Sequence, residues 1–160
     1  MQVIAELRRM EPERFLAIYE ALEQKGYGPL DGEVAKVMRF RPHAIKKLPM
    51  AQRARRAKGI MERSANAELC YEIFGSYLFK EHKELVLGFL NATGVEHDEG
   101  MIENTDANQP DSTKVADAIA ELDGKFSAED VTLYLSMCAE QWPTVNEIQE
   151  AWQSRASVSS

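Results

Sequence analysis

The chain has 160 residues, of which 44% are hydrophobic, and its formal net charge is -7. This length and apolar content suffice for one buried core without a structural metal or disulfides, and they favour a single domain. The longest apolar run has six residues, at 85–90. A membrane helix needs about 20 apolar residues and a secretory signal about 7 to 15. We therefore expect a soluble, cytoplasmic protein without a membrane partner.

Charge is distributed unevenly along the chain. Residues 1–66 contain 14 Lys and Arg against 8 Asp and Glu, whereas residues 67–160 contain 5 against 18. This asymmetry indicates either an anionic partner for the basic half or two halves that fold against each other. We therefore divide the domain into a basic helical part at 1–66, an acidic helical part at 67–153 and a frayed tail at 154–160.

Apolar spacing predicts several helices in the basic part. A short amphipathic helix at 3–10 ends before Pro12, which suits the first turn of the next helix. A brief helix is expected after Asp31 and must end before Pro42, because the residue preceding a proline disfavours the helical region. Another helix begins at Pro49, buries a narrow seam of alanine and methionine, and is expected to form a helical hairpin with the helix after it.

The basic segment 36–63 is the strongest candidate for a functional surface. It contains ten Lys and Arg and a single acidic residue, Glu62. Neutralisation within the chain or plain solvation is the favoured interpretation of this charge. Nucleic acid is the next, although stacking aromatics are missing, and an acidic protein partner is the third. The residues predicted to bind an anion or partner are Arg53, Arg55, Arg56, Lys58 and Arg63.

The stretch 69–95 has the densest apolar content. Its apolar residues change direction near 80–82, which predicts two helices with a break there, and the second helix, at 85–90, is expected at the centre of the fold. A buried strand is the alternative for 85–90. Cys70 and Cys138 fall in separate helical patterns, so reduced core cysteines are favoured over a disulfide. His82, at the break, fits a partly buried, hydrogen-bonded histidine.

An acidic loop is predicted at 96–113, because this segment combines six acidic residues with turn formers and no Lys or Arg. A small β-hairpin near 95–103, turning at Glu99-Gly100, is an additional expectation. His97, Asp98 and Glu99 supply imidazole and carboxylate groups of the kind that bind divalent metals. Their spacing matches no EF-hand, so a solvated loop is the favoured interpretation.

Three further helices are predicted in the acidic part. Asp111 or Ser112 caps the first, Ser127-x-x-Asp130 resembles a capping box for the second, and Thr144-x-x-Glu147 resembles another for the third. The fold class expected for the chain is therefore all-α, a single compact bundle of about seven or eight helices.

The sequence lacks the common catalytic motifs, including glycine-rich phosphate loops, Cys-x-x-Cys pairs and His-Glu-x-x-His. We therefore predict no catalytic residue and no cofactor. The leading functional hypothesis is a non-enzymatic interaction or adapter module that binds a protein partner. A nucleic-acid-binding protein that uses 36–63 is the alternative, and a divalent-metal-dependent enzyme around His97 is the third.

The run LVLGFLNATGVEHDEGMIEN at 85–104, the helix at 115–122 and the run AEDVTLYLSM at 128–137 resemble a group of small bacterial helical proteins of unknown function. The shared pattern is an apolar helix that ends in Phe-Leu, then Gly-Val or Gly-Ile, a His-acid turn with glycine, and a later helix with Tyr-Leu. The resemblance covers about the last 90 residues. It implies a helical fold and a soluble location, and it transfers no catalytic residue.

Overall fold

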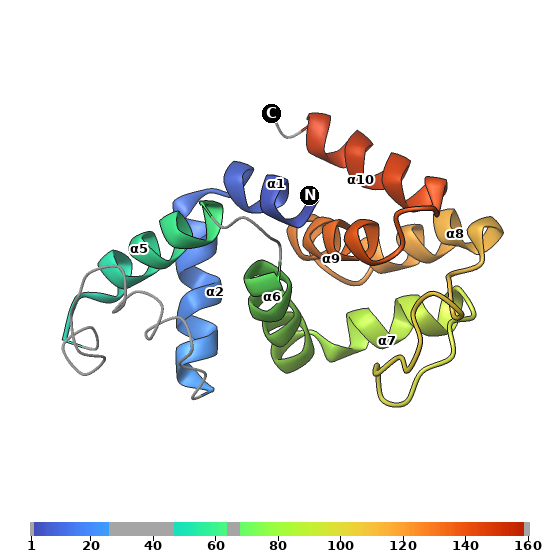
Figure 1. The fold of residues 1–160 in the computed structure, drawn as a ribbon, viewed down its shortest axis with the longest axis horizontal. Helices are drawn as coiled ribbons and strands as arrows, with labels where there is room; N and C mark the ends of the chain where they lie inside the picture. The colour runs from blue at the N-terminus through green and yellow to red at the C-terminus, as the bar shows by residue number, and fades with distance from the viewer. Residues whose placement is uncertain (1, 26–46, 64–67, 159–160) are drawn as a thin grey trace.

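The structure is a computed structural model that describes residues 2–25, 47–63 and 68–158. In these ranges it is a bundle of eight α-helices without a β-sheet (Figure 1), which confirms the predicted fold class. The helix expected after Asp31 lies outside the described residues. The eight helices are α1 (Gln2–Arg9), α2 (Pro12–Gln24), α5 (Met50–Glu62), α6 (Glu68–Glu81), α7 (Lys83–Ala92), α8 (Ser112–Asp123), α9 (Ala128–Gln141) and α10 (Asn146–Val158).

Helix α9 lies at the centre of the bundle (Figure 1). Its ten residues from Asp130 to Ala139 are all buried, and it contacts α1, α6, α8 and α10. The hydroxyls of Thr132 and Ser136 donate to carbonyls of the same helix, at 2.7 and 2.6 Å, so burial leaves neither donor without an acceptor. Helix α9 can therefore be surrounded despite its polar residues.

The prediction that 85–90 forms the centre is wrong, although this stretch is helical as expected. Helix α7 packs on α6 and α8 at the edge of the bundle, with Lys83 and Gly88 exposed. Phe89 is fully buried and packs edge-on against Tyr134, with 5.4 Å between ring centroids. Leu87 is only half-buried, and the loop at Gly100 is one of its neighbours: a Cβ added at Gly100 would lie 3.4 Å from Cδ2 of Leu87.

The break between α6 and α7 falls at a single residue, His82. Helix α6 ends at Glu81, and His82 leaves the helical region with φ -139° and ψ 46° before α7 begins at Lys83. Backbone bonds continue across the break, from His82 N to Leu78 O at 2.8 Å and from Leu85 N to His82 O at 3.0 Å. The predicted break near 80–82 is confirmed.

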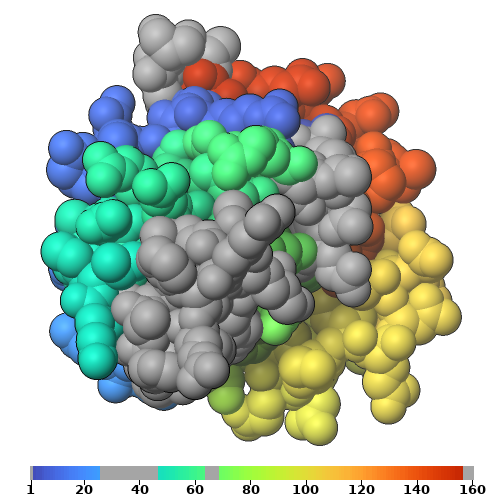
Figure 2. All heavy atoms as spheres, turned by 60° about the vertical axis from the view of Figure 1, so that its left-hand side comes forward, coloured from blue at the N-terminus to red at the C-terminus, as the bar shows by residue number. Residues whose placement is uncertain are grey.

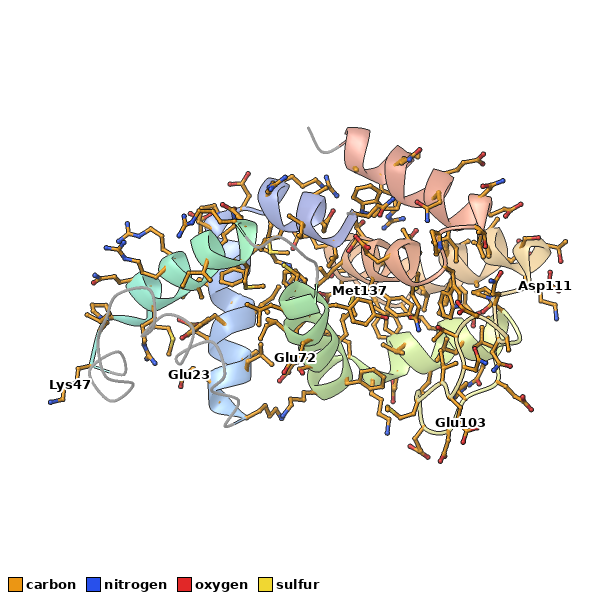
Figure 3. All side chains as sticks on the ribbon, viewed as in Figure 1. Glu23, Lys47, Glu72, Glu103, Asp111 and Met137 are labelled. Atoms are coloured by element: carbon orange, nitrogen blue, oxygen red, sulfur yellow. The ribbon has the colours of Figure 1, made fainter. Side chains whose placement is uncertain are left out.

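Helix α5 packs on α2 and α1, so the predicted hairpin of α5 with α6 is wrong. Its small inward residues Ala54 and Ala57 are buried, as is Met61, which lets α5 approach α2 closely. Glu23 on α2 lies on the side toward α5 (Figure 3) and pairs with Arg53. The basic helix therefore finds this acidic partner within the basic half.

The loop between α7 and α8 is an ordered surface loop. The hydrogen bond from Asp111 N to Thr93 O, 2.9 Å, brings its ends together, and Trp142 Nε1 donates to Thr105 O at 2.9 Å. The expected hairpin is reduced to one bridge between Asp98 and Met101, with the predicted turn at 99–100.

Gly100 is required at the tip of this loop for two reasons. Its φ of +92° lies in the left-handed region, which side chains other than glycine rarely adopt. A Cβ added there would lie 2.6 Å from Cε1 of Phe79. The tip therefore rests directly on the α6 side chain.

The predicted N-caps of α8 and α9 are confirmed: Asp111 accepts from Thr113 N, and Ser127 accepts from Asp130 N. Helix α10 begins at Asn146, later than the Thr144 capping box predicts. The frayed tail expected from Ser154 is also wrong for the described residues, since α10 runs to Val158. Arg155 holds this last turn through two bonds to Asp123, both 2.9 Å.

Candidate functional site

The candidate surface is a groove of about 930 Å³ between α2 and α5. Phe15 and Leu16 on α2 and Ala54 on α5 contribute apolar lining. Four cationic residues also line it, namely Arg55, Arg56, Lys58 and Arg63. In Figure 2, α5 lies on the left of the molecule, away from the acidic loop of 95–111 at lower right.

The five residues predicted to bind an anion or a partner have different environments. Arg53 is only 7% exposed and pairs with Glu23, so it is part of the α2–α5 interface. Lys58 pairs with Glu62 one turn along its own helix. Arg55, Arg56 and Arg63 are exposed. None of these three forms an ion pair with a residue in the described ranges.

Among the residues that the structure describes, no carboxylate of the acidic half pairs with the cations of this groove. The residues labelled Lys47 and Glu23 lie at one end of the molecule, and Glu103 and Asp111 lie at the other (Figure 3). Arg14 on α2 is a cation of the basic half that does pair with the acidic half, where it contacts Glu129 and Asp130 on α9. The separation of charge in the sequence is therefore preserved in space, and the arginines of α5 keep their positive field.

Two of the predicted metal residues, His97 and Glu99, have partners on α7, and His97 also has one in the loop. His97 accepts from Gly100 N on Nδ1 at 3.0 Å, and its Nε2 lies 2.7 Å from Oδ1 of Asn91. Glu99 pairs with Lys83 at 2.8 Å. In the part of the chain that the structure describes, no group of three or more His, Cys, Asp or Glu is placed to hold a metal ion.

A polar cluster that sequence reasoning missed joins α2, α6, α9 and the break at His82. Asp130 is 6% exposed, and its Oδ1 accepts from Arg14 and from the Tyr77 hydroxyl at 3.1 Å. His82 Nε2 lies 3.1 Å from the other oxygen, Oδ2. Burial raises the pKa of Tyr77, so this hydroxyl keeps its proton and can donate.

This cluster stabilises the packing of helices rather than forming a site for binding or catalysis. Both oxygens of Asp130 already have partners, and a buried carboxylate needs such partners to offset its desolvation. In the sequence, Asp130 is marked only by its place in a capping box. Its pairing with Arg14 could not be predicted, because the two residues are 116 positions apart and share no periodic pattern. His82 was correctly predicted as a partly buried, hydrogen-bonded residue.

Comparison of the chain with family models, with curated proteins and with solved structures gave no match. The resemblance of 85–137 to a bacterial helical group therefore stays a prediction. Among the described helices, none combines the length and apolar character that crossing a bilayer requires.

Proposed function

We propose that this chain is a non-enzymatic, cytoplasmic interaction module whose groove between α2 and α5 receives an acidic amphipathic helix of a partner protein. The observation that carries the proposal is one groove that combines apolar lining with arginines that pair with no carboxylate among the described residues. Phe15 itself is buried, so the half-buried Leu16 offers the apolar contact, while Arg55 and Arg56 supply positive charge beside it. Helix-in-groove recognition uses this pairing of an apolar stripe with charged flanks.

The dimensions of α5 specify the ligand further. Arg56 and Arg63 are seven positions apart, which corresponds to about 10 Å or two helical turns along the axis. A partner helix that carries carboxylates on one flank at a similar spacing can meet both arginines. Since α5 has 13 residues, its length of about 20 Å matches a partner segment of about three to four turns.

Nucleic acid is less well supported by the same groove. Tight phosphate binding uses about 6 to 10 cationic contacts, whereas three arginines here are unpaired within the described residues. The apolar residues between the charges match a peptide side chain better than a sugar–phosphate backbone.

The proposal is tested with a synthetic helical peptide of about 14 residues that carries leucines on one face and glutamates on both flanks. Fluorescence anisotropy of the labelled peptide measures Kd, and a mixed-sequence DNA duplex is titrated in parallel. We expect the peptide to bind with a Kd of roughly 1 to 100 µM and the duplex to bind at least about tenfold more weakly.

Two matched double reversals locate the site. Arg55→Glu with Arg56→Glu should weaken peptide binding at least about tenfold. Lys114→Glu with Lys125→Glu changes the same charge on exposed residues near α8 and should leave Kd unchanged. Equal losses in both variants would show that peptide binding depends only on the net charge of the protein and not on the groove. Tighter, salt-sensitive binding of the duplex that is lost in the α5 variant would favour the nucleic-acid alternative.

A further inference from the structure

A second concave site lies beneath the α7–α8 loop, at the opposite side of α6 from the basic groove. It is a cavity of about 230 Å³ enclosed by α6, α7, α9 and the loop tip. Fourteen residues line it, and none carries a charge. Phe79, Ile102 and Met137 are among its apolar side chains. Since a charge without a partner is costly in such surroundings, the cavity selects against ionised molecules.

A layer of residues from the α7–α8 loop contributes to the lining of the cavity. Gly100, Met101 and Ile102 form this layer. Met101 is 70% exposed, the large hydrophobic residue that stands out to solvent in the described chain. Methionine is flexible and polarizable, and it adapts to ligands of varied shape.

One edge of the cavity carries neutral polar groups. The Tyr71 hydroxyl donates to Oε1 of Gln141 at 2.6 Å, and both residues line the cavity. Burial raises the pKa of Tyr71, so the hydroxyl stays protonated and Gln141 stays its acceptor. The side-chain nitrogen of Gln141 donates to no residue that the structure describes. A ligand with one acceptor atom can take this amide N–H.

We propose that the cavity binds a small, neutral, mainly apolar molecule of about the size of one substituted aromatic ring, with a hydrogen-bond acceptor placed toward Gln141. An apolar cavity of about 150 Å³ accommodates benzene, and the larger volume here leaves space for a substituent. Ligand sites of this kind combine apolar walls with a few placed polar groups. This site is independent of the basic groove between α2 and α5.

The test compares methyl benzoate with benzoate, which share a ring and differ in charge. Titrations followed by calorimetry and by NMR should give methyl benzoate a Kd of roughly 1 mM or tighter and benzoate a Kd at least about tenfold weaker. Nuclear Overhauser contacts from the methyl benzoate ring to the methyl groups of Met137 and Ile102 should place it in the cavity. Equal binding of benzoate, contacts elsewhere or no binding of methyl benzoate would overturn the proposal.

A glycine pair supplies the matched variants. Gly75 lines the cavity, and its added Cβ would lie 3.4 Å from Cε of Met137, so Gly75→Leu fills the space. Gly88→Leu adds the same side chain on the exposed face of α7. We expect the first to weaken methyl benzoate binding at least about tenfold and the second to leave it unchanged. Equal effects of the two variants would contradict this site. If Gly75→Leu does not fold, the Overhauser contacts in the wild-type protein test the location of the ligand instead.

Discussion

His82 and Asp130 lie 3.1 Å apart, from Nε2 to Oδ2, and this contact joins the break between α6 and α7 to the central helix α9. His82 packs edge-on against Tyr77 at 5.6 Å between ring centroids, and Tyr77 shares Asp130 with Arg14. The buried carboxylate of α9 therefore contacts α2 and the C-terminal end of α6, and these three helices are distant in sequence. We infer that the cluster fixes how the N-terminal helices dock on α9.

The first prediction concerns this carboxylate. Asp130→Ala removes the acceptor for Arg14 and Tyr77 and the contact to His82, and it should lower the free energy of unfolding by about 3 to 5 kcal/mol, because it takes the buried partner from a largely buried cation. Glu129→Ala is the adjacent control: Glu129 also contacts Arg14, but its side chain is 74% exposed, so the loss should stay below about 1 kcal/mol. Urea denaturation measures both, and similar losses would show that Asp130 is not the anchor.

The second prediction separates Arg53 from Arg55, two cations close together on α5. Arg53 is buried against Glu23, so Arg53→Ala should cost about 1 to 3 kcal/mol of unfolding free energy. Arg55 is exposed in the groove, and Arg55→Ala should change stability by less than about 0.5 kcal/mol. Thermal and urea unfolding provide the values. A larger loss for Arg55 would mean that its charge is structural.

The third prediction uses two glycines with positive φ. Gly94→Ala meets only backbone strain, since φ is +75° and no atom lies within 4 Å of the added Cβ, so it should cost about 1 kcal/mol. Gly100→Ala adds a clash with Phe79 to the same strain and should cost more. The companion change Phe79→Ala should recover part of the difference. If the two glycine variants are equally stable, the loop tip does not rest on Phe79.

The fourth prediction follows from two buried thiols. Cys70 and Cys138 are both free and buried, which confirms the expectation of reduced core cysteines. Because the thiolate is the reactive form, neither should react with a disulfide reagent until the protein unfolds. Absorbance of the released thiolate measures the rate with and without urea. Prompt labelling of either residue under native conditions would contradict its burial.

The fifth prediction is a loss of stability at alkaline pH. Burial raises the pKa of Cys138 from 9.0 to about 12. The unfolded state therefore loses this proton first, and the stabilisation present below about pH 9 is lost as the pH rises toward 12. One such group contributes a slope of at most about 1.4 kcal/mol per pH unit.

Cys138→Ala should reduce this alkaline slope in urea denaturation between pH 9 and 11, while a separate loss from packing shifts the curve equally at all pH values. The remaining slope belongs to other buried groups, such as Tyr134, whose pKa burial also raises. An unchanged slope would show that Cys138 does not titrate with unfolding.

Local features of the fold were predictable from sequence because they depend on near neighbours. Apolar periodicity located the helices, the change of apolar direction located the break at His82, and side-chain chemistry located the caps Asp111 and Ser127. The turn at Glu99-Gly100 followed from its glycine. Each of these signals lies within a few residues of the structure it specifies.

The arrangement of helices was not predictable in the same way. Helix α9 was not identified as central because Thr132 and Ser136 appear polar in sequence, and their hydrogen bonds to their own helix appear only in the structure. The pairing of Arg14 with Asp130 spans the chain and carries no periodic signal. The density of charge in the sequence identified the candidate arginines of α5. Their position next to α2 and near the apolar residue Phe15 could be seen only in the structure.

The most direct test of the acidic-helix groove is a charge swap between Arg56 and a single glutamate of the synthetic peptide. Arg56→Glu alone and the peptide glutamate changed to arginine alone should each weaken binding about tenfold, because each leaves like charges facing each other. Combined, the two reversals should restore Kd to within about threefold of the original pair. Losses that simply add in the combined pair would show that the peptide does not meet Arg56 and would contradict the proposed groove.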